Sequence, residues 1–530
     1  MDDVDIRSVG VVGLGTMGAG IVEVFARAGL EVVAVEISHE LLALGRSRLE
    51  GSLAKAVDRG KLSTEDRDAQ LARVRFTTDR RDLASVDLVT EAVPERLEVK
   101  TALFAELATI CPPSTVLATN TSSLPITEIA RATSSPSRVV GMHFFNPAPV
   151  MRLVEVVHTV VTEGEVVDAV RDLASRCGKT PVVVGDRAGF VANALLFGYL
   201  NAAARAAETG QASVADIDAA VVASCGVPMG PLTLMDLIGL DVSLDVLETM
   251  FAETRDQRYA PAPLLRRLVM AGQLGRKSGR GYYRYDVTPA EAAVAAPAFA
   301  CAAPRPVDKV VAVVGAAKSP IGDALASVPV VPVEDIRDAD VVLVDGGSRA
   351  GTSELVARVA GLAKSGAVIA AATTDEAPVG TLAAGTRRAA DIVGLHVPLA
   401  PRQGVVEVVA TIASAPDSVA TAVEVVRRAG LVPVACKDRP GHIVEMLVLP
   451  HLGDAVRMVD DGYAAVADVD AAMSLGCGYP DGPFAMLASV GADNLRSGLL
   501  HLAAATHLSS LAPAPLLDEL AAFGPADARG

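Results

Sequence analysis

The chain contains 530 residues, several times the commonest domain size, so we expect several domains. Hydrophobic residues make up 51% and charged residues 21%, a balance that excludes a disordered or collagen-like chain. The formal charge of −16 argues against nucleic acid as a partner. The opening residues MDDVDIRSVG lack the basic and apolar regions of a secretory signal, and no apolar run is long enough to span a membrane. We therefore expect a cytoplasmic protein.

The first predicted elements are those of a nucleotide-binding unit. An apolar strand over Ile6–Val12 leads into the loop GLGTMG and then into an amphipathic helix. Gly13 permits a tight turn, Gly15 lets the backbone approach a pyrophosphate, and Gly18 lets the helix pack on the strand. Glu36 ends the next strand, where a carboxylate binds ribose hydroxyls and repels a 2′-phosphate, which favours NAD over NADP. The alternatives are a flavin enzyme and a non-enzymatic Rossmann module.

A histidine and a glutamate further along predict acid–base chemistry. His143 lies in what we interpret as a loop flanked by prolines, and Glu155 lies in an apolar run over Leu153–Val157 that we expect to be a strand. A carboxylate in such a strand is costly unless it is paired, and His143 is its natural partner. The pair could take the proton of an alcohol during its oxidation, or it could be a purely structural contact. The cysteines and histidines show no metal-ligand spacing, so no metal site is predicted.

The sequence repeats itself in order across an Ala/Pro-rich stretch. RVVGMHFFNP (138–147) returns as DIVGLHVPLA (391–400), and GDRAGFVANALL (185–196) returns as KDRPGHIVEMLV (437–448). Such a series indicates a duplication of an α/β domain followed by an all-helical domain. The second copy is shorter, because Asp87 follows Glu36 by 51 positions, whereas Asp340 follows Glu334 by only 6. We expect the missing segment to be a pair of helices.

The repeat and the composition predict five segments. They are a Rossmann NAD-binding domain over 1–185, a helical substrate and dimerisation domain over 186–286, a linker over 287–308, a degenerate Rossmann-like domain over 309–434 and a second helical domain over 435–530.

The second copy lacks the residues of a working site. Ala317 and Pro320 stand where the first copy has Gly15 and Gly18, so we expect one dinucleotide site in the chain. His396 corresponds to His143, but three other positions have changed. Asp375, Leu399 and Glu445 stand in place of Ser122, Asn146 and Asn193.

Several longer motifs resemble the L-3-hydroxyacyl-CoA dehydrogenase family. They are TNTSSLPI (119–126), GMHFFNPAPVMRLVEVV (141–157), GDRAGFVANALL (185–196), GPLTLMDLIGLD (230–241) and LGRKSGRGYYRY (274–285). The chain looks most like the long, duplicated bacterial forms that act on 3-hydroxybutyryl-CoA or 3-hydroxyadipyl-CoA. The resemblance implies NAD-dependent oxidation of an (S)-3-hydroxyacyl-CoA to a 3-oxoacyl-CoA in fatty-acid or aromatic-acid catabolism. The alternatives are a dehydrogenase of a free hydroxy acid and an NAD-sensing scaffold with a fossil site.

The resemblance also implies roles for individual residues. His143 would be the general base, oriented by Glu155, and Ser122 and Asn193 would hold the substrate oxygen. The residues that would contact the nicotinamide end of NAD are Glu95, Lys100, Asn146 and Lys277.

For the CoA moiety, the resemblance points to Ser52 and Arg59, within a locally basic stretch over residues 46–61. Arg59 stands where the family usually has lysine, and a solvated helix face is the alternative for this stretch. The implied partners are an acyl-CoA substrate and, within one chain, a pseudo-dimer of the two helical domains. The chain could also form a further homo-oligomer.

Overall fold

The computed structural model describes residues 6–286 and 302–523, with short gaps at 315–319, 326, 328–329, 332, 374–377, 401 and 403. The predicted linker therefore lies outside the described residues over 287–301, as does Asp375. Two compact units make up the chain. The first comprises residues 1–194, 252–254 and 461–482, and the second comprises residues 195–251, 255–460 and 483–530.

An eight-stranded sheet forms the centre of the first unit, in the order β3-β2-β1-β4-β5-β6-β7-β8. Its strands are β1 Ser8–Val12, β2 Glu31–Val35, β3 Val74–Thr77, β4 Leu88–Glu91, β5 Val116–Thr119, β6 Val139–Phe144, β7 Leu153–His158 and β8 Thr180–Gly185. Its helices are α1 Thr16–Arg27, α2 His39–Asp58, α3 Thr64–Ala72, α4 Leu97–Ile110, α5 Ile126–Ala130 and α6 Gly164–Arg176. All neighbouring strands are parallel except β6 and β7. Because helices cover both faces of the sheet, side chains on both faces of its inner strands are buried. These strands therefore read as continuous apolar runs rather than as alternating apolar and polar residues.

The strand assignment of His143 corrects our sequence interpretation. His143 lies in β6 rather than in a loop, and it stands opposite Glu155 of β7 in the antiparallel register. The flanking prolines belong to the connection after β6. Antiparallel pairing places opposite side chains on the same face, so the register itself brings the two groups together.

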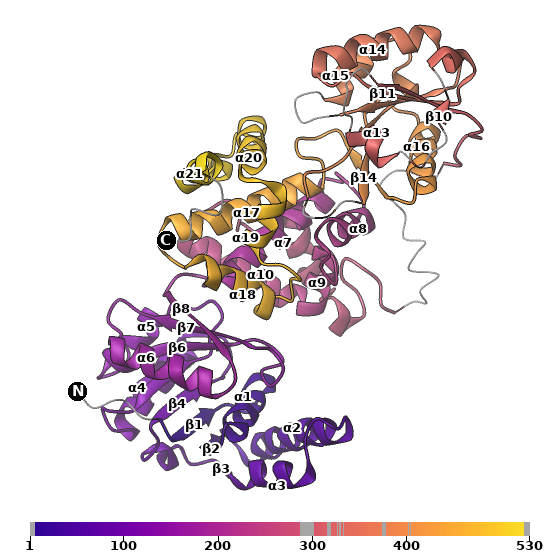
Figure 1. Cartoon of the computed structure of the whole chain (residues 1–530). Helices are drawn as coiled ribbons and strands as arrows, with labels where there is room; N and C mark the ends of the chain where they lie inside the picture. Colours follow the sequence, from indigo (N-terminus) through magenta and orange to yellow (C-terminus); the bar gives the residue numbers. More distant parts are fainter. Residues whose placement is uncertain are drawn as a thin grey trace. The chain divides into compact units, whose positions relative to one another are not determined.

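A second, seven-stranded sheet repeats this plan in the order β10-β9-β11-β12-β13-β14-β15. Its strands are β9 Val310–Val314, β10 Val330–Val331, β11 Val341–Asp345, β12 Val368–Ala372, β13 Ile392–His396, β14 Val405–Ala410 and β15 Val432–Lys437. Its helices are α13 Pro320–Ala324, α14 Arg349–Leu362, α15 Val379–Ala384 and α16 Pro416–Arg428, with α14 and α15 on one side of β11 and α16 on the other (Figure 1).

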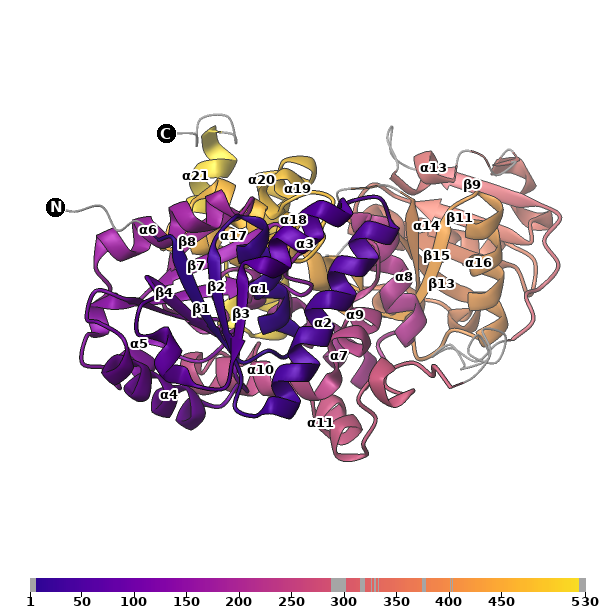
Figure 2. The same ribbon diagram turned by 90° about the horizontal axis from the view of Figure 1, so that it is seen from below.

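The segment missing from the second copy is larger than a pair of helices. It corresponds to α2, α3 and also β3, the edge strand of the first sheet. In the first unit α2 lies beside α1, and α3 lies next to both (Figure 2). The predicted loss of the second dinucleotide loop falls partly outside the described residues, and Pro320 is the first residue of α13.

Helices dominate the remaining described residues of both copies. The first set is α7 Ala192–Glu208, α8 Val214–Cys225, α9 Pro231–Ile238, α10 Leu240–Thr254 and α11 Pro263–Met270. The second set is α17 Val444–Asp460, α18 Val466–Gly476, α19 Pro483–Val490, α20 Ala492–Thr506 and α21 Pro515–Phe523. Among the described residues, no helix has the length and apolar character needed to cross a membrane.

The two copies exchange one helix each. In the first unit α18, from the second copy, packs on β7 and β8 of the first sheet. In the second unit α8, from the first copy, packs on β14 and β15 of the second sheet. Each sheet therefore has a helix from the other copy against its last two strands.

Candidate active site

The loop between β1 and α1 has the geometry of an anion-binding helix start. Gly13 has a φ of +89°, and a Cβ on Gly18 would stand 1.7 Å from the carbonyl oxygen of Gly13. Gly15 is the N-cap of α1 and makes no side-chain cap, and a Cβ there would meet nothing within 4 Å. The first N–H groups of α1 are therefore not capped by a side chain, which fits a pyrophosphate at the helix N-terminus.

Glu36 lies immediately after β2, beside this loop. Its Oε1 accepts a hydrogen bond from the Leu14 backbone N–H at 2.7 Å, and its Oε2 accepts one from the Ile37 N–H at 2.9 Å. The carboxylate is therefore held at the carboxyl end of the strand, where a ribose would lie next to the glycine loop. The residues present thus fit the adenosine half of NAD.

A buried ion pair that our sequence reasoning missed supports the next loop. Glu91, at the end of β4, is fully buried and receives two hydrogen bonds from Lys100 Nζ, at 2.8 and 2.9 Å. Lys100 Nζ also lies 3.2 Å from Glu95. Burial raises the pKa of Glu95, but Lys100 and the donors Thr121 and Ser122 outweigh that effect and the net pKa is lowered. The predicted cofactor residue Lys100 is thus almost fully buried, between the two carboxylates.

Glu95 in turn holds the loop that carries Ser122. Its Oε1 accepts hydrogen bonds from the Thr121 hydroxyl at 2.6 Å and from the Ser122 N–H at 2.8 Å. Asn193 donates to the Ser122 carbonyl oxygen at 3.3 Å, so the two predicted oxygen-binding residues lie together. Glu91 could have been found by the argument used for Glu155, because it too is a carboxylate inside an apolar strand.

His143 and Glu155 form the acid–base pair that the sequence predicted. The His143 Nδ1 and the Glu155 Oε2 lie 2.7 Å apart, and the exposed fractions of the two residues are 5% and 0%. The other carboxylate oxygen accepts hydrogen bonds from the N–H groups of Val191 and Ala192. With its Nδ1–H donated to Glu155, the imidazole keeps Nε2 as an acceptor. The ring packs against Phe145, with ring centroids 4.5 Å apart.

The remaining predicted residues are Asn146, Lys277, Ser52 and Arg59. Asn146 is exposed, next to the end of β6. Lys277 belongs to the second unit, where its Nζ lies 2.6 Å from Asp241. Ser52 lies in α2 and Arg59 is the C-cap of the same helix, seven residues further on, so the two share one face. Within the basic stretch, Arg48 is used structurally, because it donates to the Leu14 carbonyl oxygen at 3.1 Å.

The second copy has kept the pair but changed its surroundings. His396 Nδ1 and Glu407 Oε2 lie 2.7 Å apart, in the same antiparallel register as the first pair. Glu407 was not singled out in the sequence, although VVEVVA repeats LVEVVH. Glu445, in place of Asn193, accepts from the Leu399 N–H and lies 3.5 Å from His396 Nε2.

Comparison with known proteins matches both copies. The model of the 3-hydroxyacyl-CoA dehydrogenase NAD-binding domain matches residues 8–187 and 348–439. That of the C-terminal domain matches residues 189–285 and 441–528. The 3-hydroxyadipyl-CoA dehydrogenase of Escherichia coli K12 is 36% identical over 491 residues, 92% of this chain and 92% of that protein. The 3-hydroxybutyryl-CoA dehydrogenase of Mycobacterium tuberculosis is 51% identical over 282 residues, 53% of this chain and 99% of that protein.

Among solved structures, the 3-hydroxybutyryl-CoA dehydrogenase of Escherichia coli K12 is 34% identical. The match covers 99% of this chain and 100% of that one, with a TM-score of 0.76. The fold and the site thus define an NAD-dependent dehydrogenase with a duplicated Rossmann-plus-helical plan. The chain belongs to the 3-hydroxyacyl-CoA dehydrogenase family. This membership confirms the predicted fold class, the cofactor NAD and an oxidoreductase acting on 3-hydroxyacyl-CoA.

Proposed function

We propose that the chain reversibly oxidises a short-chain (S)-3-hydroxyacyl-CoA of the 3-hydroxybutyryl type, with His143 as the general base. The observation that carries this proposal is the buried His143–Glu155 pair, beside the contact between Ser122 and Asn193. His143 Nε2 accepts the proton of the C3 hydroxyl, while Glu155 fixes the tautomer and stabilises the imidazolium that forms. Ser122 and Asn193 hold the reacting oxygen. NAD, when bound, supplies the carbon that accepts the hydride.

The cofactor is held from both sides of β1. The glycine loop and Glu36 hold its adenosine half, and Glu95, supported by Lys100, holds its nicotinamide half together with Asn146. Lys277, of the second unit, is the further cofactor residue that the family resemblance implies. The Ser122 N–H donates a hydrogen bond to Glu95. This bond connects a proposed cofactor residue with a proposed substrate residue, which supports placing the nicotinamide next to the substrate. Ser52 and Arg59 of α2 bind the CoA moiety, and the exposed Lys55 and Lys61 add positive charge nearby.

The alternative substrate is 3-hydroxyadipyl-CoA, the substrate in the name of the Escherichia coli relative that matches over nearly the whole chain. The relative with the higher identity matches the first copy and is named for 3-hydroxybutyryl-CoA. NADH oxidation with acetoacetyl-CoA, longer 3-oxoacyl-CoAs and 3-oxoadipyl-CoA distinguishes them. We expect the highest kcat/KM for acetoacetyl-CoA. A higher value for 3-oxoadipyl-CoA would assign the dicarboxylyl substrate instead.

We further propose that the two helical sets form a pseudo-dimer within one chain, so that the second copy supports the active first copy. In the first unit the Tyr463 hydroxyl donates to the Gly185 carbonyl oxygen at 2.9 Å, and the Arg187 guanidinium lies over the Tyr463 ring. In the second unit Lys437 and Gln211 stand at the positions equivalent to Gly185 and Tyr463. They are also hydrogen-bonded, because the Lys437 N–H donates to the Gln211 carbonyl oxygen at 2.8 Å. This reciprocity is typical of a two-fold related pair.

Gly476 at the end of α18 offers a test in the full chain. A Cβ there would stand 2.5 Å from Leu153 of β7 and 3.3 Å from Phe145, the ring that packs on His143. Gly476→Leu should lower kcat several-fold through overpacking, although the residue lies in the second copy. Gly361→Leu in α14 is the matched control, because a Cβ there meets nothing within 4 Å. Full activity of Gly476→Leu, or of a stable monomer of residues 1–286, would contradict the pseudo-dimer.

A further inference from the structure

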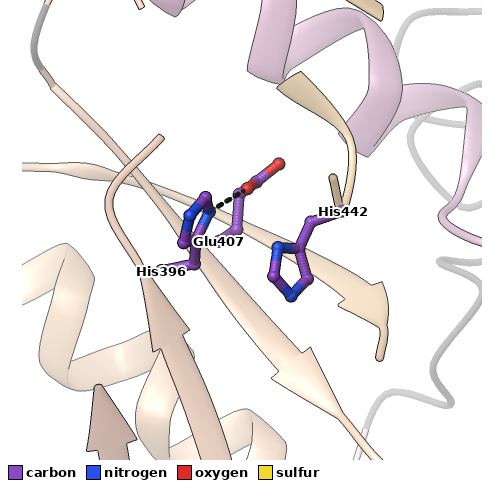
Figure 3. Close-up of side chains that lie close together, drawn as sticks. All are labelled: His396, Glu407 and His442. Atoms are coloured by element: carbon purple, nitrogen blue, oxygen red, sulfur yellow. Dashed lines mark hydrogen bonds and ion pairs between the residues drawn. The ribbon is translucent and has the colours of Figure 1, made fainter. Parts of the chain in front are cut away.

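Four ionisable side chains meet in the interior of the second unit. His396 ends β13, Glu407 stands opposite it in β14, His442 precedes α17, and Glu445 lies in the first turn of α17. Their exposed fractions are 5%, 0%, 4% and 2%. Figure 3 shows His396 joined to Glu407 with His442 alongside, and the two imidazole centroids lie 4.6 Å apart. None of the four residues has a role in the proposed dehydrogenase reaction.

Comparison with the first copy shows which members are new. His442 stands where the first copy has Phe190, and Glu445 stands where it has Asn193, while the His–Glu pair is common to both. The backbone is shared as well, because Phe190 and His442 both have positive φ, at 49° and 44°. The second copy therefore adds an imidazole and a carboxylate at two positions that are neutral in the first.

The contacts of the two carboxylates differ: Glu407 holds His396 through Nδ1, whereas Glu445 faces Nε2 of the same ring. Glu407 is saturated, because Oε2 contacts His396 Nδ1 at 2.7 Å and Oε1 accepts from the N–H groups of Ile443 and Val444, each at 2.9 Å. The contact through Nδ1 directs the other ring nitrogen, Nε2, towards Glu445 Oε1 at 3.5 Å. That distance is long for a charge-assisted hydrogen bond, which is usually about 2.7–2.9 Å.

We propose that His396 Nε2, His442 and Glu445 bind one divalent transition-metal ion of the zinc class, with Glu407 orienting His396. His396, Glu407 and His442 each offer one ligand atom within 4.8 Å of the others, and Glu445 reaches this group through its Oε1, 3.5 Å from His396 Nε2. Ligands about 2.0–2.1 Å from a tetrahedral ion lie roughly 3.4 Å from one another, close to the separation of Nε2 and Oε1. A carboxylate on the far nitrogen of a metal-binding histidine is the usual supporting arrangement.

The negative charge of the cluster also favours a divalent cation as its occupant. Two carboxylates, Glu407 and Glu445, are buried in this cluster, and negative charge in an apolar interior is costly unless a cation lies beside it. Two imidazoles and one carboxylate form a donor set that suits zinc better than magnesium or calcium. The three ligands leave a fourth position for water or another small donor. No sequence motif predicted the site, because its residues come from β13, β14 and the start of α17.

The test uses the full-length protein, stripped with a chelator and titrated with Zn²⁺ alone in a calorimeter. We expect one ion per chain, and with Co²⁺ we expect the visible absorption of a four-coordinate site. His442→Phe, which restores the residue of the first copy, should abolish stoichiometric binding, as should Glu445→Gln. Glu407→Gln should weaken binding about 10–100-fold. His143→Gln is the matched control in the first copy and should still bind one ion.

Urea unfolding of the second unit shows whether His442→Phe and Glu445→Gln are folded, and NADH oxidation by both variants should equal that of the unaltered protein. Absence of stoichiometric Zn²⁺ binding by the unaltered chain would overturn the proposal. Undiminished binding in both His442→Phe and Glu445→Gln would also overturn it, because the ion would then lie elsewhere. Loss of the ion in His143→Gln, but not in His442→Phe, would assign the metal to the first copy and equally overturn it. The proposal does not depend on the proposed dehydrogenase function.

Discussion

In the described part of the chain, three glutamates inside apolar strands are fully buried, in β4 and β7 of the first sheet and in β14 of the second. Glu91 pairs with Lys100, Glu155 with His143, and Glu407 with His396. A carboxylate without a partner at such a position would lose its hydration and gain nothing in return. Each glutamate therefore fixes the position of a cationic or ionisable side chain, and two of the three resulting pairs lie in the candidate active site.

The first residue-scale prediction concerns the proposed general base. His143→Gln keeps a hydrogen-bonding side chain near Glu155 but removes the nitrogen that accepts the substrate proton. We expect kcat for acetoacetyl-CoA reduction to fall by about 10²–10⁴-fold, with NADH affinity unchanged. Steady-state kinetics and NADH fluorescence titration measure the two quantities. Turnover close to that of the unaltered protein would remove His143 from this role.

The second residue-scale prediction concerns the ion pair below the loop that carries Ser122. Lys100→Met leaves Glu91 buried without its cation. We therefore expect the free energy of unfolding of this unit, measured in urea, to fall by about 3–5 kcal/mol. Adding Glu91→Gln to the same chain removes the uncompensated charge and should recover part of the loss. Equal destabilisation of the single and double variants would show that packing, rather than charge, is responsible.

At the scale of elements, α2 is the clearest difference between the copies. It extends from His39 to Asp58 and leaves Lys55, Arg59 and Lys61 exposed, whereas the described residues of the second copy include no counterpart of α2, α3 or β3. Arg48 fastens α2 to the dinucleotide loop through the Leu14 carbonyl oxygen. The helix that is proposed to bind CoA is therefore tied directly to the loop that is proposed to bind NAD.

This arrangement predicts a charge requirement on α2. Arg59→Ala should raise the KM for acetoacetyl-CoA roughly tenfold with little change in kcat, because the contact is made equally in the ground and transition states. Arg59→Lys should restore most of the affinity. Arg46→Ala is the control on the same helix, since Arg46 pairs with Glu50. An equal rise in KM for both alanine variants would indicate a general field rather than a site at Arg59.

The structure also shows where sequence reasoning succeeds and where it stops. The glycine loop and the duplication were predictable because their signals are local or repeated, and Glu155 was predictable because an apolar strand cannot leave a carboxylate unpaired. His143 was assigned to a loop because the prolines that follow it obscured a short strand. The His442 cluster was not predictable, because it depends on strand register and on a positive-φ turn that brings distant residues together. The exchange of α8 and α18 was likewise hidden, since it joins elements hundreds of residues apart.

At the scale of the whole molecule, the duplication has turned contacts between copies into internal ones. In the second unit, His451 of α17 is 4% exposed, packs beside Tyr199 of α7 and lies with its Nδ1 3.3 Å from the Leu195 carbonyl oxygen. Burial lowers the pKa of His451 to about 4, although the hydrogen bond to Leu195 opposes the shift. An acid-sensitive group thus lies at a contact between helices of the two copies.

This position predicts how the stability of the second unit depends on pH. The unfolded chain binds a proton at His451 near its usual pKa of about 6.5, whereas the folded chain does so only near pH 4, so unfolding becomes easier as the pH falls through this window. Between pH 7 and pH 5 the cost is about 2 kcal/mol. His451→Gln keeps an N–H donor for Leu195 but cannot be protonated. Urea unfolding of both proteins at the two pH values should therefore show about 2 kcal/mol less acid sensitivity in the variant, and identical pH dependence would place the titrating group elsewhere.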